Sequence, residues 1–291
     1  MSYTTLVSVA QLQALQAGSP QSLMVFDCSF DLANPAAGRE HYLQAHIPGA
    51  VHADLDKDLS VHAAGPDAPP TASGGRHPLP SRERFAIWLS QVGLRNDMQA
   101  VVYDRNGVNY AGRLWWMLKW LGHDAVAVLD GGWQAWQAAG GAAETGAPAA
   151  HFQSNFELKP PLRELRTATQ VRAALGQAGQ TVIDARAPAR YRGEVEPLDP
   201  VAGHIPGALN RPFTSNIAAN GLFKPAAELR GEFDQLLAGR DAASVVHQCG
   251  SGVSALPNLI AMEIAGYAPT ALFAGSWSEW CSDPGRPVEK G

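Results

Sequence analysis

A repeated five-residue segment constrains this chain more than any other feature of its sequence. His46-Ile47-Pro48-Gly49-Ala50 recurs as His204-Ile205-Pro206-Gly207-Ala208. Other features keep the same order around both copies: an apolar run that ends in Asp (25–27 and 182–184), a second apolar run (101–104 and 245–249), and a glycine shortly before a tryptophan (130–133 and 274–277). Solenoid repeats are shorter and more numerous, so the pattern predicts two copies of one globular domain of about 130 residues.

The chain has 291 residues, which is enough for two domains of ordinary size. In both copies, short apolar runs typical of strands alternate with helical patterns. This alternation predicts an α/β fold of two tandem domains, each with a mostly parallel sheet flanked by helices. We place the first domain at 1–145, a linker rich in Ala, Gly and Pro at 146–163, and the second domain at 164–291. The expected strands are 23–27, 100–104, 125–129, 181–184, 243–248 and 270–273, and the expected helices are 82–92, 111–121, 167–178, 226–237 and 253–265.

The composition excludes several classes of protein. Hydrophobic residues make up 46% of the chain and charged residues 17%, unlike a disordered chain. The net charge of −5 gives no electrostatic reason to expect nucleic acid or an anionic membrane as partner. No apolar run reaches the roughly 18 residues of a membrane span, and the N-terminal residues lack the pattern of a secretory signal. Three widely spaced cysteines argue against a disulfide framework and favour the cytoplasm.

One of those cysteines, Cys249, stands where an α/β domain places its chemistry. A predicted strand ends just before it, Gly250, Ser251 and Gly252 follow, and a predicted helix begins at Val253. Glycines let the backbone curl so that several N–H groups point inward, and the helix adds its positive N-terminal end. Both effects favour the thiolate form of a cysteine. The alternative is a buried structural cysteine before a tight turn.

Other anion-binding loops do not fit the spacing. A tyrosine-phosphatase loop requires an arginine six residues after the cysteine, where this chain has Ala255. No lysine here is followed by Ser or Thr, as a Walker loop requires. Neither Ser251 nor Ser254 lies in a Gly-x-Ser-x-Gly elbow. A short loop without arginine suits one additional sulfur on the cysteine better than a phosphate group.

The segment 249–255 resembles the active loop of the rhodanese-type sulfurtransferases, in their mercaptopyruvate sulfurtransferase version. The resemblance extends over essentially the whole chain. It includes both His-Ile-Pro-Gly-Ala segments, Asp-Gly-Gly-Trp at 130–133, the paired Trp115 and Trp116, and Gly-Ser-Trp-Ser-Glu-Trp at 275–280. It implies two tandem rhodanese domains, of which the second carries the catalytic cysteine. Asp104 stands at the matching position of the first copy.

The resemblance also implies a set of site residues. Cys249 is then the nucleophile and Arg190 binds the substrate anion. Three further residues match a Ser-His-Asp relay that orients a proton donor: Ser251, His77 and Asp56. The remaining substrate-binding loop consists of Gly250, Gly252, Val253 and Ser254.

Two features depart from that pattern or fall outside it. Mercaptopyruvate enzymes carry a second arginine shortly after this stretch, but residues 194–199 contain none. Arg211 is the candidate to replace it, with a solvated surface position as the alternative. Cys28 and Cys281 have no anion loop around them and are expected to be ordinary packing or surface thiols.

These residues predict an enzyme that moves a sulfur atom from mercaptopyruvate to an acceptor, such as thioredoxin, a small thiol or cyanide, through a persulfide on Cys249. No metal or organic cofactor is expected, because no His or Cys pair has the spacing of metal ligands. Thiosulfate is the alternative donor. The enzymes that prefer thiosulfate tend to carry basic residues in the cysteine loop, whereas Gly250-Ser251-Gly252 of this chain is neutral. The other alternative is a non-catalytic rhodanese-like binding module, which would typically have lost the cysteine as the first copy has.

Overall fold

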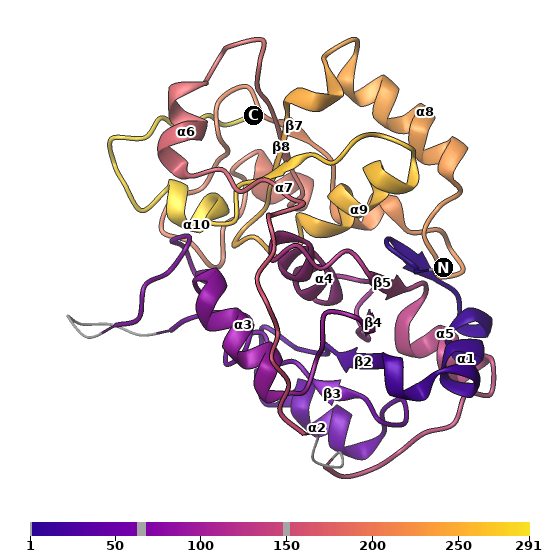
Figure 1. Ribbon diagram of the computed structural model, residues 1–291. Coiled ribbons are helices and arrows are strands. Elements are labelled where there is room, and N and C mark those ends of the chain that lie inside the picture. The colour runs from indigo at the N-terminus through magenta and orange to yellow at the C-terminus, as the bar shows by residue number, and fades with distance from the viewer. Residues whose placement is uncertain (1, 63–67, 148–151) are drawn as a thin grey trace. The chain divides into compact units, whose positions relative to one another are not determined.

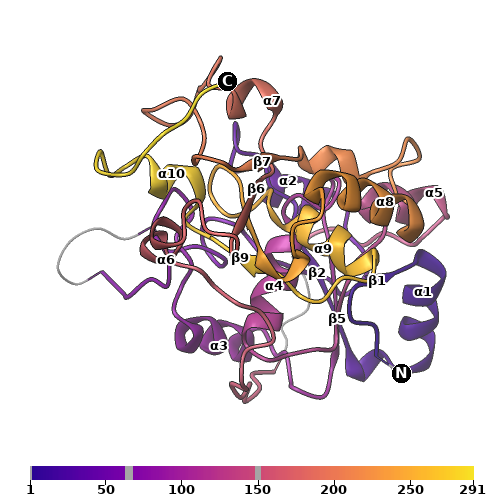
Figure 2. The ribbon, with the colours of Figure 1, turned by 90° about the horizontal axis from the view of Figure 1, so that it is seen from above.

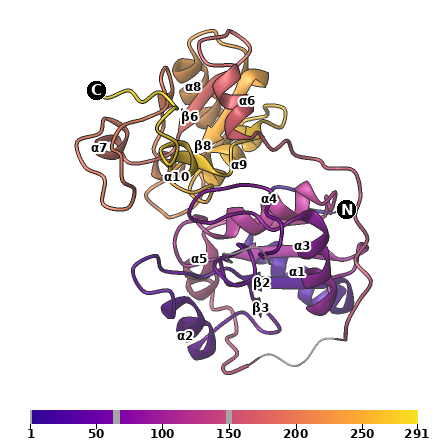
Figure 3. The same ribbon diagram turned by 90° about the vertical axis from the view of Figure 1, so that its left-hand side faces the viewer.

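The computed structural model describes residues 2–62, 68–147 and 152–291, which divide into two compact units. Unit 1 is Met1–Pro70 with Pro80–Leu162, and unit 2 is Thr71–Leu79 with Arg163–Gly291. Residues 71–79, which were expected in the first domain, group with unit 2. Residues 152–162 of the expected linker lie on unit 1, where the Ser154 N–H donates to the Ser90 carbonyl (2.9 Å) and the Lys159 N–H to that of Leu121 (3.0 Å) (Figure 3).

Unit 1 is built around a parallel sheet with the strand order β1-β5-β4-β2-β3. Its strands are β1 (Leu6–Val7), β2 (Leu23–Asp27), β3 (Val51–His52), β4 (Gln99–Tyr103) and β5 (Val126–Leu129). Its helices are α1 (Val9–Gly18), η1 (Pro20–Ser22), α2 (Ala37–Gln44), α3 (Arg82–Gln91), α4 (Ala111–Trp120) and α5 (Gly132–Ala138).

Successive residues of β2 point to opposite faces of this sheet. Val25 belongs to a buried cluster with Leu12 of α1 and Trp136 of α5. Phe26 lies 6.0 Å from Trp88 of α3, measured between ring centroids. The sheet is therefore covered by α1 and α5 on one side and by α3 on the other (Figure 1).

Unit 2 repeats this plan with the parallel strand order β7-β6-β8-β9. Its strands are β6 (Thr181–Asp184), β7 (Leu209–Asn210), β8 (Val245–Gln248) and β9 (Ala271–Leu272). Its helices are α6 (Ala168–Ala173), α7 (Pro188–Tyr191), η2 (Phe213–Asn216), α8 (Ala226–Leu237), η3 (Ala242–Ser244), α9 (Leu256–Ile264) and α10 (Ser276–Trp280). Val182 and Val246 pack in a cluster with residues of α6 and α10, while α8 and α9 cover the opposite face (Figure 2).

The predicted fold class is confirmed, and the expected strands 23–27 and 181–184 have the predicted bounds. Strand 243–248 begins two residues later than expected, because Asp241 caps a 3-10 turn at Ala242–Ser244. Helix 167–178 is shorter than expected and ends at Ala173. Within residues 2–62, 68–147 and 152–291, every helix is too short or too polar to cross a lipid bilayer.

The repeated His-Ile-Pro-Gly-Ala segment makes the same contacts in both units. In unit 1, His46 stacks on Tyr42 with 4.1 Å between ring centroids, and the Tyr42 hydroxyl donates to the Ala50 carbonyl (2.7 Å). The Gly49 N–H donates to the carboxylate of Glu144 (2.7 Å). The matching contacts in unit 2 are His204 on Tyr191 (3.8 Å), the Tyr191 hydroxyl to Ala208 (2.6 Å) and the Gly207 N–H to Glu289 (2.8 Å). The segment therefore ties the chain together in the same way in each copy.

Candidate active site

Cys249 follows β8 directly and heads the loop that leads into α9. The residue is buried, with 2% of its surface exposed. Its backbone N–H donates to Oγ of Ser276 (3.1 Å), and its carbonyl accepts from the N–H of Trp277 (3.0 Å). The Gly250 carbonyl accepts from the N–H of Ser278 (2.9 Å). Since these bonds join the start of the loop to α10, two neighbouring elements fix the position of the cysteine.

Gly252 is the residue that allows this loop to turn. Its φ is +73°, a conformation that side chains disfavour. A methyl group at this position would lie 2.1 Å from the carbonyl oxygen of Ala274. The loop therefore requires a glycine here both for its backbone conformation and for its close approach to the chain after β9.

The first copy shows what a loop of this shape can hold. Asp104 follows β4 as Cys249 follows β8, and each residue stands seven positions before the first residue of the next helix. The carboxylate of Asp104 is fully buried, and four backbone N–H groups donate to it. The donors are Asn106 (2.8 Å), Val108 (3.0 Å), Tyr110 (2.8 Å) and Ala111 (2.8 Å). This loop is thus a nest of backbone N–H groups around the side chain of its own first residue. Burial raises the pKa of Asp104, and the four N–H groups oppose that shift because they favour the charged carboxylate.

The loop of unit 2 has the same length and the same glycine position, but Val253 lacks the positive φ of its counterpart Val108 (+69°). Gly252 has the same place and the same sign of φ as Gly107 in unit 1 (+69°). The residues that match the first three donors of the Asp104 nest are Ser251, Val253 and Ala255. The N–H that matches the fourth, Leu256, donates instead to the Val253 carbonyl (3.1 Å). Cys249 therefore heads a loop that matches the Asp104 loop in length and in the position of its glycine.

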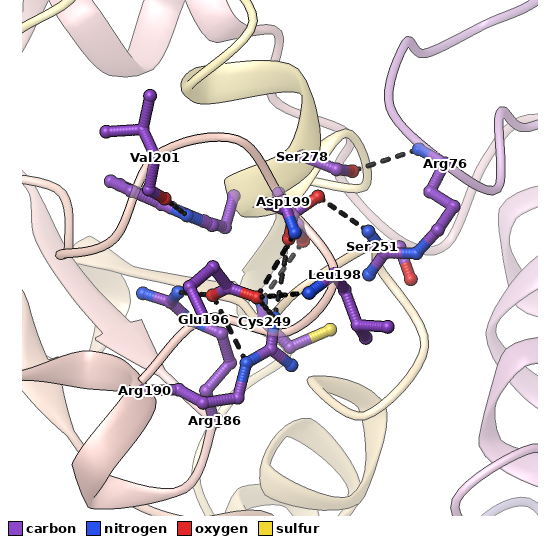
Figure 4. A network of polar contacts seen from close by, with 12 residues as sticks. Arg76, Arg186, Arg190, Glu196, Leu198, Asp199, Val201, Cys249, Ser251 and Ser278 are labelled. Carbon is purple, nitrogen blue, oxygen red and sulfur yellow. Dashed lines mark hydrogen bonds and ion pairs between the residues drawn. The ribbon is translucent and has the colours of Figure 1, made fainter. Parts of the chain in front are cut away.

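Arginines border this loop. A methyl group added to Gly250 would lie 3.2 Å from Nη2 of Arg76 and 3.5 Å from Nη1 of Arg190. Arg190, which the sequence singled out, is held by Glu196 through its Nε (3.2 Å) and Nη2 (2.6 Å). Its guanidinium group therefore has a defined orientation beside the cysteine loop (Figure 4).

Arg76 is a residue that sequence reasoning missed. It belongs to unit 2, because the Gly74 N–H donates to Glu279 (3.2 Å) and the Arg76 N–H donates to Oγ of Ser278 (2.9 Å). Its Nη1 forms an ion pair with Asp199 at 2.6 Å (Figure 4). The available signal was its place directly before His77. The packing of this loop on α10, which brings the arginine to the site, cannot be read from the sequence.

Arg186 adds a third guanidinium group to the network. It pairs with Asp184 at 2.6 Å and with Glu196 at 3.3 Å. Burial opposes its charge, but Asp184, Glu196 and Cys249 attract it and together raise the pKa of Arg186 above its ordinary value.

The other two cysteines lie in surroundings that favour the thiol. Burial raises the pKa of the Cys28 thiol and, to a smaller extent, that of Cys281. Those two thiols are therefore held in the protonated form.

The predicted partners Ser251 and His77 lie together in unit 2. Nδ1 of His77 is 2.7 Å from Oγ of Ser251, and both residues are buried. Asp56 lies in unit 1, where its Oδ1 is 3.1 Å from Nε2 of His62. The Ser–His pair is thus formed, while the participation of Asp56 in the relay stays a prediction.

Arg211 has partners of a different kind. Its Nε donates to Asn216 (2.9 Å), its Nη2 donates to Glu232 (2.7 Å), and its guanidinium group lies 4.3 Å above the ring of Phe233. These contacts attach it to α8 and η2, whereas Arg76 and Arg190 are the guanidinium groups found beside Gly250. Of the remaining loop residues, Val253 is buried and Ser254 is half-buried.

Comparison with known proteins identifies the family. A model of the rhodanese-like domain matches residues 8–139 and 167–283, one segment in each copy. A protein of Pseudomonas aeruginosa named "Probable 3-mercaptopyruvate sulfurtransferase" is 46% identical over 294 residues, and the match covers both chains completely. A candidate thiosulfate sulfurtransferase of Mycobacterium tuberculosis is 41% identical over 290 residues, which is 98% of this chain and 97% of the relative.

Solved structures agree with this assignment. The crystal structure of a 3-mercaptopyruvate sulfotransferase from Escherichia coli is similar with a TM-score of 0.76 at 30% sequence identity. The match covers 95% of this chain and all of the other. With both of its copies matched and relatives that span its full length, the chain belongs to the two-domain rhodanese-type sulfurtransferases.

Proposed function

We propose that this chain transfers a sulfur atom from mercaptopyruvate to a nucleophilic acceptor through a persulfide on Cys249. The observation that carries the proposal is the loop of Cys249. Its counterpart in unit 1 holds the buried carboxyl group of Asp104 with four backbone N–H groups. A loop of this shape favours the thiolate of Cys249 before the reaction and the anionic persulfide after it.

Arg190 and Arg76 anchor the donor in this proposal. Both guanidinium groups border Gly250, next to the nucleophile. A carboxylate accepts charge-assisted hydrogen bonds from guanidinium groups, and two such groups hold it in one orientation. Arg76 therefore takes the place that the sequence analysis offered to Arg211, whose side chain is committed to Glu232.

The reaction has two steps. In the first, the Cys249 thiolate attacks the sulfur of mercaptopyruvate, an S–S bond forms and the C–S bond breaks. The electron pair of that bond leaves on carbon as the enolate of pyruvate, which then takes up a proton. The pair of Ser251 and His77, 2.7 Å apart, is placed to stabilise the enolate oxygen and to deliver that proton, and Asp56 is the proposed third member.

In the second step an acceptor removes the outer sulfur. A reduced thioredoxin, a small thiol or cyanide attacks that sulfur, and the S–S bond breaks to return the thiolate of Cys249. No metal or organic cofactor enters either step. The loop N–H groups serve both half-reactions, because each begins and ends with negative charge on sulfur.

Thiosulfate is the second candidate donor, and the name of the Mycobacterium tuberculosis relative favours it. The neutral loop Gly250-Ser251-Gly252 supports mercaptopyruvate. A purely binding function is disfavoured, because the cysteine and its loop are intact in the second copy.

The test is a comparison of kcat/KM for the two donors with the same thiol acceptor. Release of pyruvate measures turnover of mercaptopyruvate, and release of sulfite measures turnover of thiosulfate. The proposal expects kcat/KM to be larger for mercaptopyruvate. A larger value for thiosulfate would assign the enzyme to the other donor, and no turnover of either would contradict sulfur transfer.

A further inference from the structure

The guanidinium groups at the Cys249 loop do not form an uncompensated positive site. Arg186 pairs with Asp184, Arg190 with Glu196, and Arg76 with Asp199. Three arginines thus face three carboxylates, and the formal charge of these six side chains is zero. Any anion that enters adds its charge to that of the Cys249 thiolate, so the number of charges on the donor matters.

Asp199 has a special position in this network because it bridges the two arginines that border Gly250. Its Oδ1 lies 2.6 Å from Nη1 of Arg76, and its Oδ2 lies 3.4 Å from Nη2 of Arg190. The Asp199 side chain is only 4% exposed, which limits screening by solvent. Burial raises the pKa of Asp199, whereas the charges of Arg76 and Arg190 oppose that shift and favour the ionised carboxylate. Figure 4 shows Asp199 between the two guanidinium groups.

The bridge leaves one face of each arginine toward the loop. Asp199 contacts Nη1 of Arg76, while Nη2 is the Arg76 atom nearest to Gly250. Likewise, the carboxylates contact Nε and Nη2 of Arg190, while its Nη1 is the nearest to Gly250. A donor can therefore contact both arginines while Asp199 and Glu196 stay in place and balance their two charges.

We propose that Asp199 determines the charge class of the sulfur donor, so that the site accepts a monoanion and disfavours a dianion. The inference rests on the proposed function and deepens it. Mercaptopyruvate presents a single carboxylate, whereas thiosulfate carries two negative charges. A dianion beside Asp199 is repelled by this carboxylate about twice as strongly as a monoanion, and the six side chains, whose formal charges sum to zero, offer no surplus positive charge to offset that repulsion.

The first experiment compares the variants Asp199→Asn and Glu194→Gln with the wild-type enzyme. Asparagine keeps the shape and an oxygen that accepts from Arg76, but it removes the charge. Glu194 is the matched control, because it lies in the same segment and its exposed carboxylate pairs only with the exposed Arg192 among the contacts described for it. The measurement is the ratio of kcat/KM for thiosulfate to kcat/KM for mercaptopyruvate at fixed ionic strength.

Because Cys249 serves both donors, effects of the substitution on the nucleophile cancel in this ratio. We expect Asp199→Asn to raise the ratio by about tenfold, since one unit charge within roughly 10 Å at an effective dielectric constant near 20 changes affinity by about that factor. Glu194→Gln is expected to leave it unchanged. An unchanged ratio in Asp199→Asn, whether or not kcat/KM changes for both donors alike, would show that Asp199 only positions the arginines and would overturn the inference.

A second readout does not depend on turnover. Calorimetric binding of sulfate, a dianion, is compared with that of pyruvate, a monoanion, in the wild type and in Asp199→Asn. The inference expects the variant to gain affinity mainly for sulfate, and an equal gain for both anions contradicts it. If Asp199→Asn fails to fold, Asp199→Ser removes the same charge. If the wild type transfers no sulfur, the proposed function fails, whereas these binding data still decide whether Asp199 selects charge.

Discussion

Nδ1 of His77 lies 2.7 Å from Oγ of Ser251, although 174 positions separate the two residues in the chain. The short loop that carries His77 packs on α10 through Gly74 and Arg76, and this packing brings the imidazole to the loop of Cys249. The two donors differ in whether their leaving group needs a proton from this pair. Mercaptopyruvate leaves as an enolate that must be protonated, whereas thiosulfate leaves as sulfite, a stable anion.

Replacement of either member should therefore affect the two donors differently. Ser251→Ala or His77→Ala is expected to lower kcat for mercaptopyruvate by about 10²–10⁴-fold, the usual contribution of general acid–base catalysis. Turnover of thiosulfate should fall much less. The double variant should be little worse than the poorer single variant, because the two side chains act as a unit. Equal losses with both donors would instead assign the pair to the shape of the loop.

The two arginines beside Gly250 should contribute to binding of the donor. Arg76→Met and Arg190→Met are each expected to raise KM for mercaptopyruvate by roughly 10- to 150-fold, which corresponds to the loss of a charge-assisted hydrogen bond of about 1.5–3 kcal/mol. Steady-state kinetics measures this. Arg192→Met, at an exposed arginine of the same segment, is the control and should leave KM unchanged. An unaltered KM in Arg76→Met would remove Arg76 from the donor site, and a raised KM in Arg211→Ala would restore the sequence-based expectation for Arg211.

The two glycines of the cysteine loop should respond differently to alanine. In Gly250→Ala the methyl group lies 3.2 Å from Nη2 of Arg76, at the end of a flexible side chain, so the fold should tolerate it while KM for the donor rises. In Gly252→Ala the methyl group lies 2.1 Å from a backbone oxygen, in a conformation with φ of +73°. We expect that variant to lose thermal stability as well as activity. Thermal unfolding monitored by circular dichroism separates the two, and equal melting temperatures for both variants would contradict this account of Gly252.

His247 predicts how the stability of unit 2 depends on pH. This residue of β8 is completely buried, and burial, together with the charge of Arg211, lowers the pKa of His247 to about 3. In the unfolded chain a histidine takes up its proton near pH 6.5. Between these two values the unfolded state binds more protons than the folded state, so the free energy of unfolding should fall as the pH is lowered from about 6.5 toward 3.

The variant His247→Asn assigns this effect to the residue. Denaturant unfolding followed between pH 7 and 4 should show a weaker pH dependence in the variant than in the wild type. His123 of unit 1, whose pKa burial lowers to about 4, acts in the same direction and remains in both proteins. An identical pH dependence in the two proteins would mean that His247 can be protonated in the folded state.

Much of the fold could be predicted from the sequence, because the duplication allows the main apolar runs of one copy to be compared with those of the other. The strand 181–184 and the cysteine after β8 follow from a buried apolar run and a glycine pair, which are local features. The two-residue strands β1, β3 and β7 were not predicted, because so short a strand carries no periodic pattern of its own, whereas β9 was expected within the apolar run 270–273. Arg76 was missed because its ion pair with Asp199 spans 123 positions and depends on the packing of a loop. Arg211 could not be separated from the site by sequence, since Glu232, which holds it, lies on a different element.

The most direct test of the account is the mass of the protein after reaction with mercaptopyruvate in the absence of an acceptor. The account predicts that the wild-type chain gains the mass of one sulfur atom, that peptide mapping places the gain on Cys249, and that addition of a thiol removes it. Cys249→Ser should gain no sulfur, because serine is a far weaker nucleophile at neutral pH, while Cys28→Ser and Cys281→Ser should gain it as the wild type does. A sulfur gained on Cys28 or Cys281, or turnover at the wild-type rate by Cys249→Ser, would contradict the proposed mechanism.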